Sequence, residues 1–195
     1  MKLDPLIDID TDDQVYSPSD DSYMLLRTTE LAPGETFLEV GSGTGLVAIH
    51  AARTGANVTA SDVNPHAVEL TKRNAAKNRV QLKVVQSDLF EKVGGLFDVI
   101  SFNPPYLPGD SNSTSWIERS WSGGETGGEI PVRFLQDAWR HLAPGGRIHM
   151  VLSSLTGLTS VLKAAKERYD SEMLEEQRLF FESLFAYRFK VRSVH

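Results

Sequence analysis

The tetrapeptide Asn103-Pro104-Pro105-Tyr106 could hold a planar nitrogen group in place. It follows an apolar run, 97–102, that predicts a buried strand. Proline donates no backbone N–H and pushes the preceding residue into an extended conformation. The side-chain carbonyl of Asn103 and the main-chain carbonyl of Pro104 could therefore converge on one NH₂ group, with Tyr106 as a wall beside it. Alone, the motif is equally typical of a strand that ends in a rigid turn.

A second motif lies upstream, where an apolar run breaks into alternate glycines and then into a helical pattern, 37–52. Strand, glycine turn and helix open a nucleotide-binding βαβ unit, in which missing Cβ atoms at Gly41 and Gly43 let a ligand approach the backbone. Leu46 stands at the last glycine position of the dinucleotide pattern, and no lysine follows as in a P-loop. The carboxylate of Glu39 would attract an ammonium or sulfonium group. The turn therefore predicts a site for a cationic ligand.

Two further carboxylates follow the next predicted strands. Asp62 ends the run 58–62 at the distance where an acid binds ribose hydroxyls, and Asn64-Pro65 is the better start for the following helix. Asp88 comes soon after the run 81–86. In a parallel sheet the carboxyl ends of the strands emerge at one edge. We therefore expect four polar side chains to face one crevice: Glu39, Asp62, Asp88 and Asn103.

Together these motifs resemble the class I S-adenosylmethionine-dependent methyltransferases that modify amino groups. The segments 16–22 and 121–124 are similar to the HemK-related branch of archaea and eukaryotes, which methylates the glutamine of the Gly-Gly-Gln loop in class 1 translation release factors. The resemblance runs from about Tyr16 to the end of the chain and includes Phe180-Phe181-Glu182. It implies an α/β fold, Rossmann-like and doubly wound, with helices on both faces of a seven-stranded, mostly parallel sheet that has an antiparallel closing strand.

The resemblance also implies roles in binding S-adenosylmethionine. Glu39 would approach the methionyl ammonium, with backbone access at Gly41 and Gly43, and Asp62 would take the ribose hydroxyls. Asp88 would accept a hydrogen bond from the adenine amino group. Leu89 would pack on the adenine ring, while a lid would close over the cofactor. The remaining residues expected at the cofactor are Tyr16 and Ser22 of that lid, and Asn103.

For the reaction, the resemblance implies that the substrate is the amide of a protein glutamine. Asn103 and Pro104 would accept its two N–H groups, and Tyr106 would pack against its plane. No general base is assigned, because a cationic product can lose its proton to water afterwards. The implied partners are a class 1 release factor as substrate and a small zinc-binding activator subunit.

Two other functions stay open. An adenine-N6 methyltransferase acting on DNA or RNA could use the same tetrapeptide to hold an adenine amino group. A net charge of −6 and no sign of a target-recognition domain argue against nucleic acid as a partner. A non-catalytic, cofactor-binding scaffold subunit is the second alternative, although every motif residue is present.

Composition predicts a single cytoplasmic domain. We expect a flexible acidic segment at 1–15 and one methyltransferase domain over 16–195. The chain has no cysteine, which excludes disulfides, zinc-thiolate sites and thiol nucleophiles, and its five histidines show no ligand spacing. No metal site and no membrane span are predicted.

The long stretch 107–128 predicts an irregular loop beside the proposed site. Trp121 within it fits a lid or a packing anchor equally well. Elsewhere the pattern predicts helices at 19–31 and 132–142, and closing strands near 173–174 and 184–189.

Overall fold

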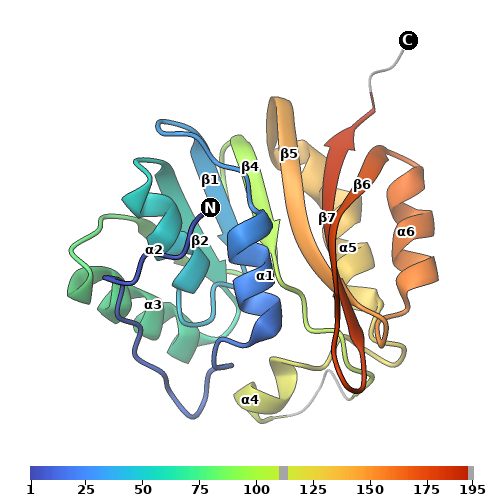
Figure 1. Cartoon of the computed structure of the whole chain (residues 1–195), viewed down its shortest axis with the longest axis horizontal. Helices are drawn as coiled ribbons and strands as arrows, with labels where there is room; N and C mark the ends of the chain where they lie inside the picture. The colour runs from blue at the N-terminus through green and yellow to red at the C-terminus, as the bar shows by residue number, and fades with distance from the viewer. Residues whose placement is uncertain (110–113, 193–195) are drawn as a thin grey trace.

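A computed structural model describes residues 1–109 and 114–192, so part of the predicted loop, 110–113, lies outside the described residues. Its seven strands form one sheet in the order β3-β2-β1-β4-β5-β7-β6 (Figure 1). The strands are β1 (Thr36–Val40), β2 (Asn57–Asp62), β3 (Lys83–Gln86), β4 (Phe97–Phe102), β5 (Leu142–Ser153), β6 (Tyr169–Arg178) and β7 (Ser183–Val191). The helices are α1 (Asp20–Thr28), α2 (Leu46–Arg53), α3 (Pro65–Lys77), α4 (Trp116–Arg119), α5 (Glu129–Ala138), the 3₁₀ turn η1 (Trp139–His141) and α6 (Leu158–Lys166).

The sheet is parallel except where β7 runs antiparallel to both β5 and β6. The predicted fold class, including the antiparallel closing strand, is therefore confirmed. Chain order reverses between β1 and β4, which are neighbours although β2 and β3 separate them in sequence. Ligands of such sheets bind at the carboxyl ends of the strands beside this reversal. Pairing of Val40 with Phe102 brings the glycine turn and the Asn103 motif side by side there.

The strand β1 forms because its alternating side chains are buried on both faces of the sheet. Phe37 joins the apolar cluster under α1 and α2, while Leu38 and Val40 join the cluster under α5 and α6. Glu39 shares the face of Phe37, which directs its carboxylate toward the start of α2. The two-residue period of the strand thus places one acid at the amino end of a helix.

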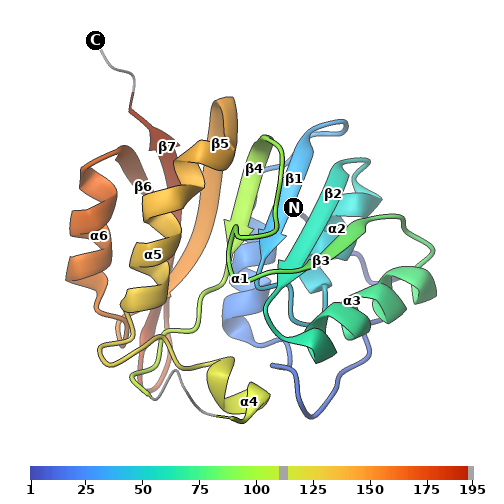
Figure 2. The same ribbon diagram turned by 180° about the vertical axis from the view of Figure 1, so that it is seen from behind.

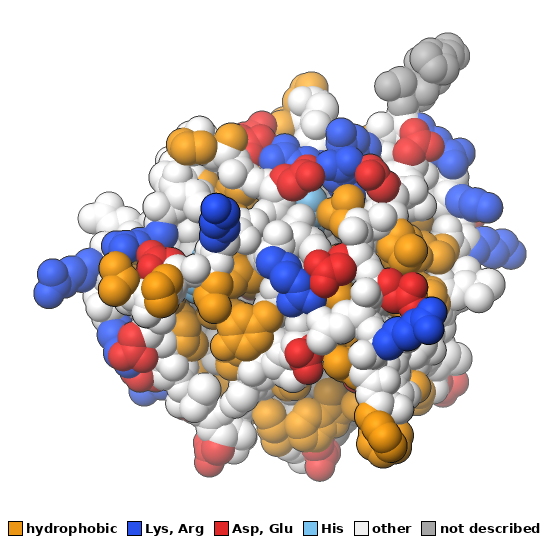
Figure 3. All heavy atoms as spheres, in the orientation of Figure 1, with side chains coloured by type: hydrophobic (Ala, Val, Ile, Leu, Met, Phe, Trp, Pro, Cys, Tyr) orange, Lys and Arg blue, Asp and Glu red, His pale blue; other side chains and the backbone are white. Residues whose placement is uncertain are grey.

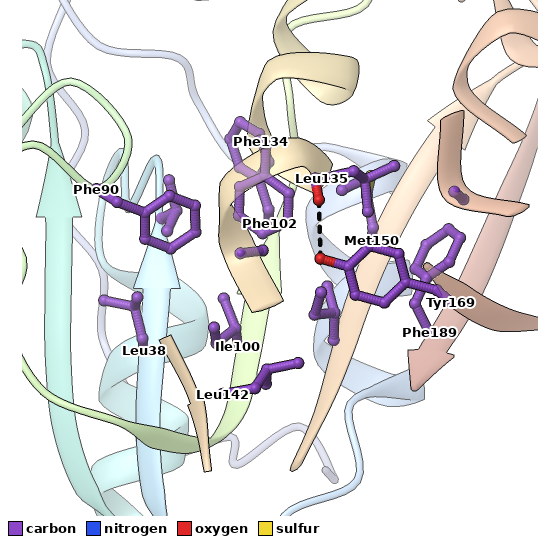
Figure 4. Packing of buried hydrophobic residues seen from close by; sticks show 14 of the residues in the cluster. Leu38, Phe90, Ile100, Phe102, Phe134, Leu135, Leu142, Met150, Tyr169 and Phe189 are labelled. Carbon is purple, nitrogen blue, oxygen red and sulfur yellow. Dashed lines mark hydrogen bonds between the residues drawn. The ribbon is translucent and has the colours of Figure 1, made fainter. Parts of the chain in front are cut away.

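Helices cover both faces, as Figures 1 and 2 show from opposite sides. On the α5 side, Phe134 packs against Phe102 and Phe90 with ring centroids 4.7 and 5.1 Å apart (Figure 4). The hydroxyl of buried Tyr169 donates to the carbonyl of Leu135 at 2.8 Å, which ties β6 to α5. This core fixes α5 over the end of β4, close to the Asn103 motif.

Within the described residues, no helix is long and apolar enough to cross a membrane.

Residues 8–10 of the segment 1–15 lie along α3. The flexibility expected of this segment from its acidic composition stays a prediction. Asn74 accepts from the backbone N–H of Asp10 at 3.0 Å and donates to its carbonyl, also at 3.0 Å. One helical turn on, Asn78 makes the same pair of bonds with Asp8, at 2.9 and 2.8 Å. Each side-chain amide therefore pairs with the extended backbone as the backbone of a neighbouring strand would. Lys77 also forms ion pairs with both aspartates.

Replacement of Asn74 tests this attachment. Asn74 is fully buried and also donates to the carbonyl of Thr44 in the glycine turn at 2.9 Å. Asn74→Ala should lower the free energy of unfolding by about 1–3 kcal/mol, because it leaves buried backbone groups without partners. Hydrogen exchange over residues 8–16 should also accelerate.

Lys77→Ala is the matched control, since it removes only ion pairs at the surface of the same helix. Surface ion pairs contribute little, so this variant should melt close to the wild type. Equal melting temperatures and equal exchange in all three proteins would show that the segment is not held by Asn74.

Candidate functional site

A cavity of about 520 Å³ opens at the carboxyl ends of β1, β2 and β4. Its walls come from the N-terminal segment, the glycine turn, the end of β2, the Asn103 motif and the loop that follows it. The structure brings all the predicted site residues to this one cavity: Tyr16, Ser22, Glu39, Gly41, Gly43, Asp62, Asp88, Leu89, Asn103, Pro104 and Tyr106. Their individual roles stay predictions.

The glycine turn is shaped by close contacts on one side and by space on the other. Gly41 has a φ of +66°, and a Cβ there would lie 3.1 Å from the ring of Phe102. Gly43 has a φ of +53°, and a Cβ there would meet nothing closer than 3.9 Å. Its N–H donates to the carboxylate of Asp62 at 2.9 Å. The turn can therefore expose its backbone to a ligand at close range.

Two carboxylates form one wall of the cavity. Glu39 is buried and accepts from the N–H of Ala48 in the first turn of α2 at 2.8 Å. Burial raises the pKa of Glu39 well above its usual range, and the negative charge of Asp62 adds to this, although the bond from Ala48 opposes it. Burial also raises the pKa of Asp62, against the N–H groups of Gly43, Asn64 and Val63. A cationic ligand would stabilise both charged forms.

The two interpretations of Asp62 are now distinguished by geometry. Asn64 caps α3, because its side chain accepts from the N–H of His66 at 2.9 Å and Pro65 occupies the first helical position. Asp62 instead accepts from Gly43 and from the N–H of Asn64. It therefore faces the cavity and holds the glycine turn.

Asp88 lies at the other end of the cavity and forms an ion pair with Arg133 of α5. This partner was not predicted, since the two residues are 45 positions apart and meet only because α5 crosses over the sheet. The pair leaves one carboxylate oxygen of Asp88 for a further donor. Leu89 has a φ of +44°, is partly buried against the core and borders the same cavity.

The expected lid residues meet at Asp21, which the sequence did not single out. The hydroxyl of Tyr16 donates to Asp21 at 3.2 Å, and Ser22 donates to it through its N–H at 2.6 Å and its hydroxyl at 3.1 Å. Ser22 also accepts from the N–H of Ser19 at 3.4 Å, as part of the cap of α1. Ser22 thus starts a helix and borders the cavity at the same time. Its lid role stays a prediction.

The Asn103 motif presents an acceptor without a donor. The Oδ1 atom of Asn103 is buried and has no hydrogen-bond partner in the described part of the chain. An unsatisfied buried carbonyl costs about 1–3 kcal/mol, so native structures seldom retain one without a reason. Pro104 beside it is buried and rigid. The arrangement suits an incoming N–H group.

Tyr106 closes this part of the cavity and is surrounded by acids. Burial raises the pKa of its phenol strongly, and the charges of Asp21 and Glu182 raise it further. Glu182 lies close enough to Tyr106 to raise the pKa of its phenol, and it accepts from the hydroxyl of Ser153 at the end of β5. The resemblance included Glu182 without assigning it a role. Its position next to the Asn103 motif could not be predicted from the sequence, because Glu182 and Tyr106 are 76 residues apart.

The loop after the motif folds back and holds it. The N–H of Leu107 donates to the carbonyl of Trp121, and the N–H of Gly123 donates to the carbonyl of Leu107, both at 2.9 Å. A Cβ on Gly123 would lie 2.6 Å from the carbonyl oxygen of Pro105. The backbone of Trp121 is therefore an anchor, while its side chain, 39% exposed, borders the cavity. Both interpretations of Trp121 remain open.

The stretch 107–128 was expected to be an irregular loop, but part of it is helical. Residues 116–119 form the short helix α4, with Ser115 as its cap, and Trp116 and Arg119 reach the cavity.

Within the described ranges, no three His, Asp or Glu residues gather as a metal site would require.

Glu39→Gln tests the carboxylate wall. Loss of the negative charge should weaken binding of S-adenosylmethionine by about 10–100-fold, the scale of a hydrogen bond to a charged group. Calorimetry at pH 8 measures this directly. Saturable NAD binding, with no response to S-adenosylmethionine, would contradict the assignment of the cavity.

The same variant has an expected effect on stability. Because burial raises the folded-state pKa of Glu39, its contribution to stability falls as pH rises from its ordinary value of 4.5 through the raised value. Without ligand, Glu39→Gln should therefore unfold at the same or a higher temperature than the wild type at pH 8. A clearly less stable variant would mean that the ionised carboxylate supports the fold.

Comparisons with known proteins agree with this geometry. The profile of the methyltransferase small domain matches residues 7–180. The chain is 42% identical over 156 residues to a putative protein N5-glutamine methyltransferase of Methanocaldococcus jannaschii, with 78% of this chain and 79% of the relative covered. It is 34% identical over 168 residues to the methyltransferase HEMK2 of Mus musculus, with 79% and 78% covered.

A solved structure has the same fold. It is the Mtq2–Trm112 complex of E. cuniculi, described as responsible for methylation of the eRF1 translation termination factor. The TM-score is 0.72 at 21% identity, over 92% of this chain and 99% of that one. The expected enzyme class and its cofactor, S-adenosylmethionine, are confirmed. Because the profile spans most of the chain, with the glycine turn and the Asn103 motif, the chain belongs to the methyltransferase small domain family.

Proposed function

We propose that this methyltransferase modifies the side-chain amide nitrogen of a protein glutamine, in the Gly-Gly-Gln loop of a class 1 translation release factor. One observation carries the proposal: the buried Oδ1 of Asn103 has no partner among residues 1–109 and 114–192, and Asn103 lines the same cavity as the carboxylates Glu39 and Asp62. The names of the relatives, N5-glutamine methyltransferase and release factor glutamine methyltransferase, support the choice of acceptor.

The cofactor half of the cavity fits a cationic nucleoside. When bound, S-adenosylmethionine supplies a methyl group made electrophilic by the sulfonium charge. Glu39 and Asp62 offer anionic acceptors at one wall, and the backbone of Gly41 and Gly43 is open for close approach. Asp88, held by Arg133, offers an oxygen at the other end for an amino group.

The substrate half fits a primary amide. The amide nitrogen is a poor nucleophile, because its lone pair is delocalised into the carbonyl, so the enzyme has mainly to orient it. Asn103 Oδ1 and the carbonyl of Pro104 would accept its two N–H groups and hold it at roughly 3–3.5 Å from the methyl group. Both acceptors also stabilise the partial positive charge that grows on nitrogen. Tyr106 would fix the plane of the amide, and the product's proton can leave to water.

Electrostatics favour a protein acceptor over a nucleic acid. Asp21 and Glu182 both lie near the phenols of Tyr16 and Tyr106, so negative charge borders the substrate entrance. The phosphates next to a flipped adenine would be repelled there. The adenine-N6 alternative is therefore the weaker one. A non-catalytic scaffold is also disfavoured, because it would have no use for an unpaired acceptor beside the cofactor site.

A small activator subunit is part of the proposal. Support comes from the E. cuniculi relative, whose fold this chain shares and which was solved as a complex with Trm112. The zinc content of such a subunit and the cytoplasmic location of the enzyme stay predictions.

Asn103→Ala tests the chemistry. The variant should bind S-adenosylmethionine within a few fold of the wild type and lose on the order of 10²-fold or more in methyl transfer, as expected when one preorganised polar group is removed. Asp62→Ala is the matched contrast, since it should weaken cofactor binding first. Calorimetry and a radiolabel transfer assay separate the two effects. Full activity of the Asn103→Ala variant would exclude the proposed orientation of the amide.

The acceptor is tested in the same assay. A recombinant release factor and an adenine-containing DNA and RNA mixture are offered side by side, and labelled sites are mapped by mass spectrometry. We expect label on the glutamine of the Gly-Gly-Gln loop. Rapid labelling of nucleic acid with none on the glutamine would instead establish the adenine-N6 alternative.

A further inference from the structure

The turn between β6 and β7 exposes two phenylalanines to solvent. Phe180 is 92% exposed and Phe181 86%, more than any other large hydrophobic side chain in residues 1–109 and 114–192. Their rings meet edge to face with centroids 4.7 Å apart, so they form one apolar knob. Figure 3 shows hydrophobic side chains gathered along the lower edge of the molecule, where α4 and this turn lie in Figure 1.

The fold does not require phenylalanine at these positions. The N–H of Leu179 donates to the carbonyl of Glu182 at 2.8 Å, which makes Phe180 and Phe181 the two loop residues of a tight hairpin. Such loops are usually Asn-Gly, Asp-Gly or Gly-rich, and neither phenylalanine has a positive φ that would select its type. The rings add nothing to the core and expose apolar surface to water. An exposed apolar patch of this kind marks an interaction site.

The knob is attached rigidly to the substrate end of the cavity. Ser154 donates its N–H to the carbonyl of Ser183, and its hydroxyl accepts from the N–H of Ser183, at 2.8 and 3.0 Å. Glu182, the residue next to Phe181, accepts from Ser153, and its charge lies close enough to Tyr106 to raise the pKa of that phenol. The chain thus passes from the exposed rings to the wall of the amide site within two residues.

We propose that Phe180 and Phe181 dock the protein substrate, by packing against an apolar surface beside the loop that carries the acceptor glutamine. The inference rests on the proposed function and adds a binding surface outside the cavity. A glutamine side chain offers the cavity few contacts, whereas exposed aromatic rings are typical anchors of protein interfaces. Docking at the knob would hold the glutamine loop over Asn103.

A second copy of this chain is a less suitable occupant. A symmetric contact through the knob would bring Glu182 and its acidic surroundings close to the same groups of the other copy, and like charges in an interface oppose association. A substrate surface that is apolar next to the knob and neutral or basic around it meets no such repulsion.

The double variant Phe180→Ser/Phe181→Ser tests the proposal with a folded release factor as substrate. KM should rise on the order of 30-fold, as expected for loss of a hot spot of about 2 kcal/mol, with little change in kcat. Affinity for S-adenosylmethionine and the melting temperature should stay at wild-type values, because neither ring touches the cavity or the core. The single variant Phe181→Ser should give a smaller effect of the same kind.

Leu96→Ser is the matched control. Leu96 is 54% exposed and precedes β4, so it lies at the edge of the sheet opposite the cavity. Its replacement removes a comparable exposed apolar side chain, and KM for the release factor should not change.

The outcomes separate this proposal from the proposed function. If the wild type labels the release factor and the double variant has the same KM, the docking role is wrong and the function stands. If the wild type does not label the release factor, the proposed function fails and the docking role fails with it. If sedimentation shows a wild-type dimer that the double variant loses, while KM is unchanged, the knob is a self-contact and the proposal is overturned.

Discussion

The site depends on the hydrogen bonds that hold the glycine turn open. Three side chains from outside the turn bind its backbone: Asp62 accepts from the N–H of Gly43, Thr71 donates to the carbonyl of Gly43, and Asn74 donates to the carbonyl of Thr44. Two of these come from α3, whose other contacts hold the N-terminal segment. The turn and the segment that leads to Tyr16 are therefore positioned by one helix. A looser α3 would disturb both together.

Two kinds of group in the cavity are energetically unfavourable without a ligand. Each would be stabilised by a different reactant. Glu39 and Asp62 carry charge that burial disfavours, and a cationic cofactor relieves this. Asn103 carries an acceptor that no described residue pairs with, and the N–H of a substrate amide relieves this. The protein thus gives up stability at the two points where the reactants bind. Because the two groups lie in one cavity, relief of both requires both reactants to be present, which is the condition for transfer.

Features that depend on local pattern were predictable from the sequence. The run 97–102 corresponds to β4 to the residue, and the glycine turn, Asp62 and the Asn64-Pro65 helix start lie where their spacing placed them. These features need only the strand period, glycine conformations and the geometry of parallel strands. Interactions between distant segments were not predictable. The pairs Asp88 with Arg133 and Glu182 with Tyr106 form only after α5 and the β6–β7 turn have packed on the sheet.

The N-terminal segment gives a second example of contacts between distant residues that the sequence pattern does not predict. Its acidic composition did not indicate that Asn74 and Asn78, four residues apart on α3, present amides that pair with its backbone. Asparagine in a helix has no strong propensity that would announce such a use. Only the orientation of the exposed helix face, which the fold determines, shows that these side chains can replace a neighbouring strand.

The antiparallel direction of β7 explains how a distant part of the chain reaches the substrate. Since β7 opposes both β5 and β6, the strand β6 runs with the parallel strands and ends at their carboxyl edge. A parallel connection would have crossed over the sheet and started β7 at the opposite edge. The tight turn instead lies beside the end of β5, where Ser153 and Tyr106 meet Glu182. Reversal of one strand thus places the β6–β7 turn, with its acid and its exposed rings, at the edge where the glutamine must enter.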